Sequence, residues 1–97
     1  MYQKPNYTKA NPNDFEVGME FYLGAGIWGN NVTVIKVTPK AIQVQGKEDK
    51  VANIKPVSCW FPKSAIMWRE EEELETAEIA EWLDLSIWQL RLIGMAE

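Results

Sequence analysis

Short runs of alternating apolar and polar residues predict a series of β-strands in the middle of the chain. Residues 19–23 (MEFYL) alternate in this way, which is typical of a strand with one buried face. Residues 32–38 are β-branched at five of seven positions and predict the strongest strand. After a turn at Thr38-Pro39-Lys40, residues 42–45 (IQVQ) alternate again, so they should pair back on the preceding strand as a hairpin.

Two further strands are expected at residues 57–61 and 65–69, after the polar connection 46–56 and around the break at Pro62. Five short strands joined in a meander predict a small antiparallel barrel of the SH3-like or OB-like type. The strand spacing and the early hairpin favour the SH3-like type. The predicted core residues are Phe21, Val34, Ile42, Val44, Phe61 and Ile66.

The segments on either side of this barrel, assigned to residues 15–69, have a different character. Residues 1–14 hold two prolines and few side chains that could be buried, which predicts a flexible tail. After the barrel, residues 70–97 are expected to form an acidic link followed by a helical segment. The link is the run of four glutamates at 70–73. The overall prediction is therefore an α+β protein, with a barrel followed by a C-terminal helix or helical hairpin.

The apolar residues after Thr76 are compatible with one helix or with two. One helix would carry two apolar stripes, the first made of Ile79, Trp82, Leu83, Leu90 and Ile93, and the second of Leu85, Trp88, Leu92 and Met95. Two helices would break at 84–86, where Ser86 and Gln89 have the spacing of a capping box and Leu85 and Leu90 that of a hydrophobic staple. We favour the break. In either case the segment is apolar enough to cover the barrel, a partner, or both.

Composition argues against an enzyme. The 97 residues are 46% apolar and 25% charged, the balance of one soluble domain, with no long apolar run and no secretory leader. The absence of histidine removes the commonest general base and zinc ligand. The single cysteine, Cys59, has apolar neighbours and predicts a buried thiol in a cytoplasmic protein. We expect no catalytic residue, cofactor or metal.

Charge is divided unevenly along the chain. Residues 1–68 hold eight lysines and five acids, a balance of +3, whereas residues 69–97 hold two arginines and nine acids, a balance of −7. The sum is the net charge of −4. This asymmetry indicates two regions with different roles, or a basic region that faces an acidic one.

Two stretches resemble known families. Residues 60–64 (WFPKS), preceded by residues 40–44 (KAIQV), resemble a pattern in small SH3-like barrel proteins of phages and mobile elements, over residues 32–68. This resemblance implies a barrel and a small accessory protein without a settled activity. Residues 76–91 resemble a helix-turn-helix, although Asp84 replaces the usual turn glycine and the region is acidic. That second resemblance implies DNA binding, which the negative charge disfavours.

A candidate binding face combines the aromatic residues Tyr22, Trp28 and Trp60 with Lys36 and Lys63. Aromatic side chains with lysines fit a platform for single-stranded nucleic acid or a peptide groove. They also fit a groove filled by the protein's own C-terminal helices, which we favour because the apolar segment must be buried.

The sequence therefore predicts a non-catalytic binding or regulatory module that acts through protein contacts. Self-association is expected through the stripe Leu85, Trp88, Leu92 and Met95. The alternatives are a nucleic-acid-binding protein and an acidic inhibitor whose residues 69–97 occupy a basic site on a host protein. No membrane association is expected.

Overall fold

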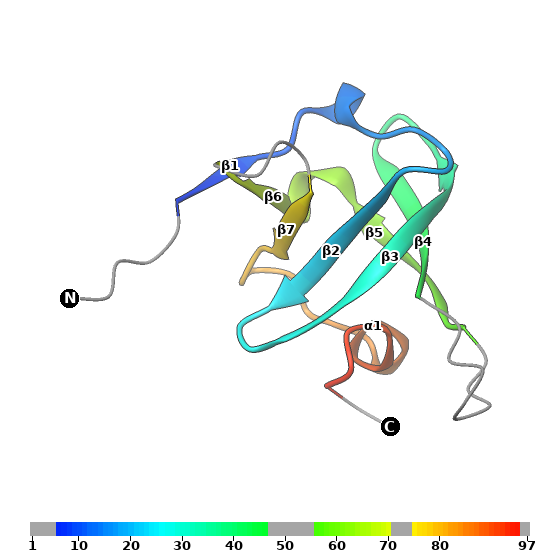
Figure 1. Cartoon of the computed structure of the whole chain (residues 1–97), viewed down its shortest axis with the longest axis vertical. Helices are drawn as coiled ribbons and strands as arrows, with labels where there is room; N and C mark the ends of the chain where they lie inside the picture. The colour runs from blue at the N-terminus through cyan, green and yellow to red at the C-terminus, as the bar shows by residue number, and fades with distance from the viewer. Residues whose placement is uncertain (1–5, 47–55, 71–74, 96–97) are drawn as a thin grey trace.

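A computed structural model describes residues 6–46, 56–70 and 75–95, which form a mostly-β molecule with one short helix (Figure 1). The described strands are β1 (Tyr7–Lys9), β2 (Glu20–Ala25), β3 (Trp28–Val37), β4 (Ala41–Gly46), β5 (Ser58–Pro62), β6 (Ile66–Arg69) and β7 (Thr76–Ile79). They form one sheet in the order β1-β6-β7-β2-β3-β4-β5. The helix α1 spans Ile87–Leu92, and the 3-10 turns η1 and η2 span Pro12–Asp14 and Lys63–Ala65.

The central meander confirms the strands predicted from period-two patterning. β2, β3, β4 and β5 pair antiparallel in chain order, with a bulge between Val34 and Lys36. The inward-facing side chains of these strands make one continuous core because alternate residues share a face. All six predicted core residues are buried: Phe21, Val34, Ile42, Val44, Phe61 and Ile66. The predicted inward direction of Phe61 and outward direction of Trp60 are therefore confirmed.

The coarse prediction of an α+β fold is confirmed. The predicted closed barrel is not found, because the sheet is open. β1 and β5 are the two ends of the strand order. β6 pairs antiparallel with both β1 and β7, and β7 pairs parallel with β2. Figure 1 shows β1, β6 and β7 grouped on one side of the molecule, with α1 across the end of the β3 and β4 ribbons. β7 therefore joins the meander to the outer strands.

The prediction that residues 76–83 begin a helix is wrong. Thr76–Ile79 is a strand whose alternate residues Ala77 and Ile79 are buried. The backbone groups on either side of it are satisfied by two neighbouring strands, β2 and β6, which the helical reading of the sequence did not take into account. Because the first of the two helices is absent, the helix-turn-helix arrangement is absent as well.

The prediction of a flexible tail at 1–14 is wrong for the part that the structure describes. β1 pairs with β6 over Tyr7–Lys9, and Asn11 and Asp14 form a capping box around η1. The Asp14 carboxylate also accepts a hydrogen bond of 3.0 Å from the Trp68 indole Nε1. Polar residues in this segment are ordered because β6 supplies their partners, which are about fifty to sixty residues away in the sequence.

The helix start predicted at Ser86 is confirmed. The Ser86 hydroxyl accepts from the Gln89 backbone N–H at 3.2 Å, and the Gln89 side chain accepts from the Ser86 N–H at 2.8 Å. The helix then turns Leu92 and the following Ile93 into the core of the sheet. The C-terminal segment therefore contributes two side chains to the core of its own sheet, while the predicted groove residues Tyr22, Trp28 and Trp60 remain exposed.

Two expected features lie outside the described residues: most of the polar connection 46–56 and the acidic run after Glu70. Within the part that is described, the chain has no helix long and apolar enough to cross a membrane.

Replacement of Phe61 should destabilise the fold strongly, whereas replacement of its neighbour Trp60 should not. Phe61 has no exposed surface, and truncation of a buried Phe costs about 3–5 kcal/mol. Trp60 is 43% exposed and projects from the other face of β5. We expect a much lower urea midpoint for Phe61→Ala and a small change for Trp60→Ala. Equal midpoints for the two variants would contradict the inward assignment of Phe61.

Candidate functional site

Four of the five tryptophans are exposed. Only Trp68 lies in the core, at 5% exposure, where it packs against Phe15 and Phe21. The exposed fractions of the others are 42% for Trp28, 43% for Trp60, 56% for Trp88 and 63% for Trp82. Tryptophan is the side chain with the most apolar surface to lose by burial, so this surface is the first place to look for function.

Residues 80–92, here called the C-terminal strap, position two of these tryptophans. The strap starts where the Ala80 N–H donates to the Ala65 carbonyl at 2.7 Å, just beyond β7. It ends as α1, which packs beside β5, where the Gln89 Nε2 donates to the Trp60 carbonyl at 2.8 Å. Figure 1 shows the strap passing from the end of β7, by the ends of β2 and β3, to α1. Within the strap, α1 is the part that packs against β5.

The strap presents its apolar side chains to solvent as well as to the core. Trp82, Ile87 and Trp88 are each at least half exposed, and Trp60 lies on β5, against which α1 packs. The Arg91 guanidinium stacks over the Trp88 ring at 4.8 Å from its centroid. We call Trp60, Trp82, Ile87 and Trp88 the aromatic edge.

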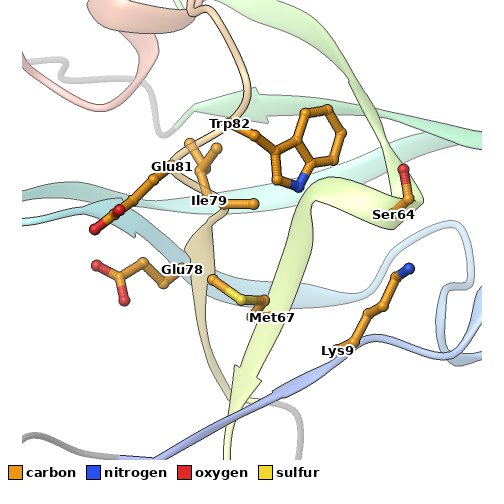
Figure 2. Close-up of a pocket in the computed structure, with 8 residues that line it drawn as sticks. Lys9, Ser64, Met67, Glu78, Ile79, Glu81 and Trp82 are labelled. Carbon is orange, nitrogen blue, oxygen red and sulfur yellow. The ribbon is translucent and has the colours of Figure 1, made fainter.

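A hollow of about 720 Å³ opens beside the aromatic edge. Figure 2 shows the Trp82 indole on one side of it, with Lys9 and Ser64 at one end and Glu78 and Glu81 at the other. Met67 and Ile79 are among its apolar lining. The hollow thus combines an aromatic wall with charges of opposite sign at its two ends.

A second hollow, of about 790 Å³, shares residues 78–81 with the first. Its apolar lining includes Ile27, which is 90% exposed at the tip of the β2–β3 hairpin. The Glu78 carboxylate accepts from the Gly26 N–H at 3.3 Å, which ties the hairpin tip to β7. Gly26 has a φ of +64°, a conformation that favours glycine at this turn. Both hollows are open, so they suit a protein surface better than an enclosed small molecule.

Lys36 and Trp60 lie on one outer face of the sheet. In the strand register Lys36 is opposite Gln43, and Gln43 is opposite Trp60, so the three side chains form a row across β3, β4 and β5. Tyr22 is also on an outward position, of β2, and its ring packs over Gly29 of β3, where a Cβ would clash with it. Of the predicted aromatic–lysine face, Lys36, Trp60 and Tyr22 therefore lie on outward positions of the sheet.

Three other predicted site residues are placed differently. Lys63 is buried at 6% exposure, and its ammonium donates to the Pro12 carbonyl at 2.8 Å, so it does not rim a binding face. Trp28 belongs to β3 rather than to a loop, on the side of the strand that carries Asn30 and the buried Val32. Leu92 is buried at 2% exposure, and its carbonyl accepts from the Asn30 side chain.

The predicted self-association stripe is only partly exposed. Leu85 is half-buried against the core and Leu92 is in it, whereas Trp88 and Met95 remain on the surface. The sequence reasoning missed Trp82, Ile87 and Ile27 as surface residues. A signal for Trp82 was present in the acidic residues Glu81 and Asp84 near it, but the helical interpretation grouped Trp82 in an apolar stripe with Ile79 and Leu83.

The cysteine thiol, the possible metal ligands and the buried polar side-chain atoms were considered as candidate chemical groups. Burial raises the pKa of the Cys59 thiol above its ordinary value, which leaves less of the nucleophilic thiolate. In the described ranges, no three His, Cys, Asp or Glu side chains are grouped as metal ligands. Each buried side-chain N or O atom in those ranges has a hydrogen-bond partner.

No family model, curated protein or solved structure matches the chain. The functional interpretation below is therefore argued from the sequence and the geometry.

The position of Lys63 predicts a stabilising role that its exposed neighbour Lys40 lacks. Lys63→Ala removes a buried side-chain stem and leaves the Pro12 carbonyl without its partner, which should lower the free energy of unfolding by about 1–3 kcal/mol. Lys40→Ala should change it by less than about 0.5 kcal/mol. Urea unfolding of both variants is the measurement. Matching midpoints would show that Lys63 does not hold η1 on the sheet.

Proposed function

We propose that the protein is a non-catalytic binding module that acts through contacts with another protein chain. The observation that carries the proposal is the exposure of four tryptophans on a domain whose core is already filled. Tryptophan is enriched among the residues that dominate protein interfaces, because its ring buries a large area at little cost in conformational entropy. Two of the four lie on the C-terminal strap, and Trp60 lies on β5, against which α1 packs.

The second candidate is binding of single-stranded nucleic acid, and one observation favours it. The described residues of β3, β4, β5 and α1 contain Lys36 and Arg91 and no acidic side chain. Bases could stack on Trp60 and Trp88 while these cations contact phosphates. However, few cations are available, and the net charge of −4 opposes the approach of a polyanion. Protein binding therefore ranks first.

We also propose that the sheet has an SH3-like arrangement. A four-stranded meander, followed by the single 3-10 turn η2 and then by β6, supports an SH3-like arrangement extended by β7 and β1. The resemblance of residues 40–44 and 60–64 to phage and mobile-element proteins supports an accessory role. A single cysteine that is buried supports a cytoplasmic location.

Capture on the immobilised full-length chain tests protein binding. We expect a nuclease-treated lysate of the natural host to yield a bound protein, or a second copy of this chain. The double variant Trp60→Ala/Trp88→Ala should lose it because interface tryptophans typically contribute about 2 kcal/mol or more each. Val17→Ala, which alters an exposed residue outside the aromatic edge, should retain it. Equal capture by the double variant and the wild type would contradict the proposal.

Nucleic-acid binding should be weak at physiological salt. A fluorescence titration with mixed-sequence single-stranded oligonucleotides at about 0.15 M salt should show no saturation at micromolar protein. Lys36→Glu should therefore produce no measurable change. Micromolar or tighter binding that Lys36→Glu abolishes would instead establish the second candidate.

A further inference from the structure

We propose that the hollow on the outer face of β1, β6 and β7 binds a segment of a partner protein in which one apolar residue lies between an acidic and a basic residue. This inference rests on the proposed function, because it states which chemistry a protein partner presents to the hollow beside Trp82. It makes no use of Trp60, Trp88 or the sheet face that carries Lys36.

The floor of the hollow is a row of three side chains that crosses three strands. In the strand register, Lys9 of β1 is opposite Met67 of β6, and Met67 is opposite Glu78 of β7. Opposite residues share a face of the sheet, and all three side chains line the hollow. A cation, an apolar group and a carboxylate therefore follow one another along the row, with about 10 Å between the outer two Cα atoms at ordinary strand spacing.

The rim of the hollow repeats this order of polar groups. Figure 2 shows Ser64 at the same end as Lys9, and Glu81 at the same end as Glu78. The Lys9 ammonium and the Ser64 hydroxyl are both hydrogen-bond donors suited to a carboxylate. The two carboxylates at the other end repel each other, so a cation between them is favourable.

The polar groups at the two ends are not occupied by contacts within the protein. Among residues 6–46, 56–70 and 75–95, the side chains of Lys9, Ser64 and Glu81 have no hydrogen bond or ion pair. Glu78 accepts from the Gly26 N–H through Oε1 alone. A ligand with complementary charges therefore has no internal competitor at Lys9 or at Glu81.

Trp82 supplies the wall against which the apolar residue of the ligand packs. Its indole is 63% exposed, and in Figure 2 it lies beside the row, between the two charged ends. An apolar side chain placed over Met67 would contact that ring and remove both groups from water. Burial of apolar surface contributes more than an exposed ion pair, so this contact supplies most of the affinity and the charges supply the orientation.

Charge complementarity selects a segment that carries both signs of charge. A purely basic segment would place a cation against Lys9, and a purely acidic one would place a carboxylate against Glu78 and Glu81. A nucleic acid would meet the same two carboxylates, and the net charge of −4 opposes its approach as well. The order of charges in the hollow is matched by a ligand that is acidic at one end and basic at the other.

A peptide titration of the full-length chain, followed by proton–nitrogen correlation NMR, tests the inference. The probes are pentapeptides of sequence AELKA, AELEA and AKLKA, with acetylated and amidated ends so that only their side chains are charged. The Trp82 indole N–H signal, identified by its loss in Trp82→Phe, should shift with AELKA at an affinity on the order of millimolar. We expect AELEA and AKLKA to bind more weakly by about threefold or more.

Reversal of one charge should change which peptide is preferred. Lys9→Glu makes both ends of the hollow acidic, so AKLKA should then bind more tightly than AELKA. Lys36→Glu, which makes the same change in net charge on another face, should leave AELKA preferred. An unfolded chain cannot exchange one preference for the other, so this result is not explained by lost stability. If Lys9→Glu does not fold, Lys9→Gln should abolish the preference for AELKA over AKLKA.

Two results would overturn the inference. The first is a Trp82 signal that none of the peptides shifts at several millimolar. The second is AKLKA as the tightest ligand of the wild type, because net charge alone would then explain binding. If either occurs while Trp60→Ala/Trp88→Ala still abolishes capture of a host protein, the proposed function stands without the inference. If the peptides rank as expected but that double variant captures as well as the wild type, the hollow is supported and the role of Trp60 and Trp88 is wrong.

Discussion

The pairing of β7 with both β2 and β6 is the interaction on which the rest of the structure depends. Without this strand, the meander β2–β5 and the pair β1–β6 would be two small sheets with no strand pairing between them. Two-stranded and short sheets are marginal in water, so their union into one sheet gives the core a continuous surface to bury. The four residues of β7 form hydrogen bonds with the edge strand of each half, β2 on one side and β6 on the other. The end of β7 is also the point at which the strap begins.

The position of the aromatic edge follows from that point of departure. The strap travels from Ala80, bonded to Ala65, to α1 beside β5. Its Leu83, Leu85 and Leu92, and the following Ile93, belong to the core or pack against it. Trp82, Ile87 and Trp88 are at least half exposed. A domain that needed tryptophan only for stability would bury it, as this one buries Trp68.

In the function that we propose, the described side chains act in recognition of a partner. The buried ammonium of Lys63 and the buried thiol of Cys59 serve the fold, the first by bonding the Pro12 carbonyl and the second as a small apolar group. The charges are separated between elements: β3 carries Lys36 and α1 carries Arg91, with no acid in β3, β4, β5 or α1, whereas residues 75–84 carry four acids and no cation. Such separation supports oriented docking of a partner more than it supports turnover of a substrate.

The sequence by itself determined what depends on near neighbours. Period-two alternation placed Phe21, Val44 and Phe61 in the core and Tyr22 and Trp60 outside, because the pleat alone decides which face a residue occupies. The capping box fixed the start of α1, because Ser86 and Gln89 satisfy each other's backbone groups within one turn.

Tertiary structure decided what depends on distant partners. Thr76–Ile79 has apolar residues compatible with a helix, and it became a strand because β2 and β6 offered hydrogen bonds on both sides. Residues 7–14 are ordered by Trp68 and Lys63, and Lys63 is withdrawn from the candidate binding face by the same contact. Local spacing encodes neither outcome, since the β2 partners of β7 and the partners of Pro12 and Asp14 are more than fifty residues away in the sequence.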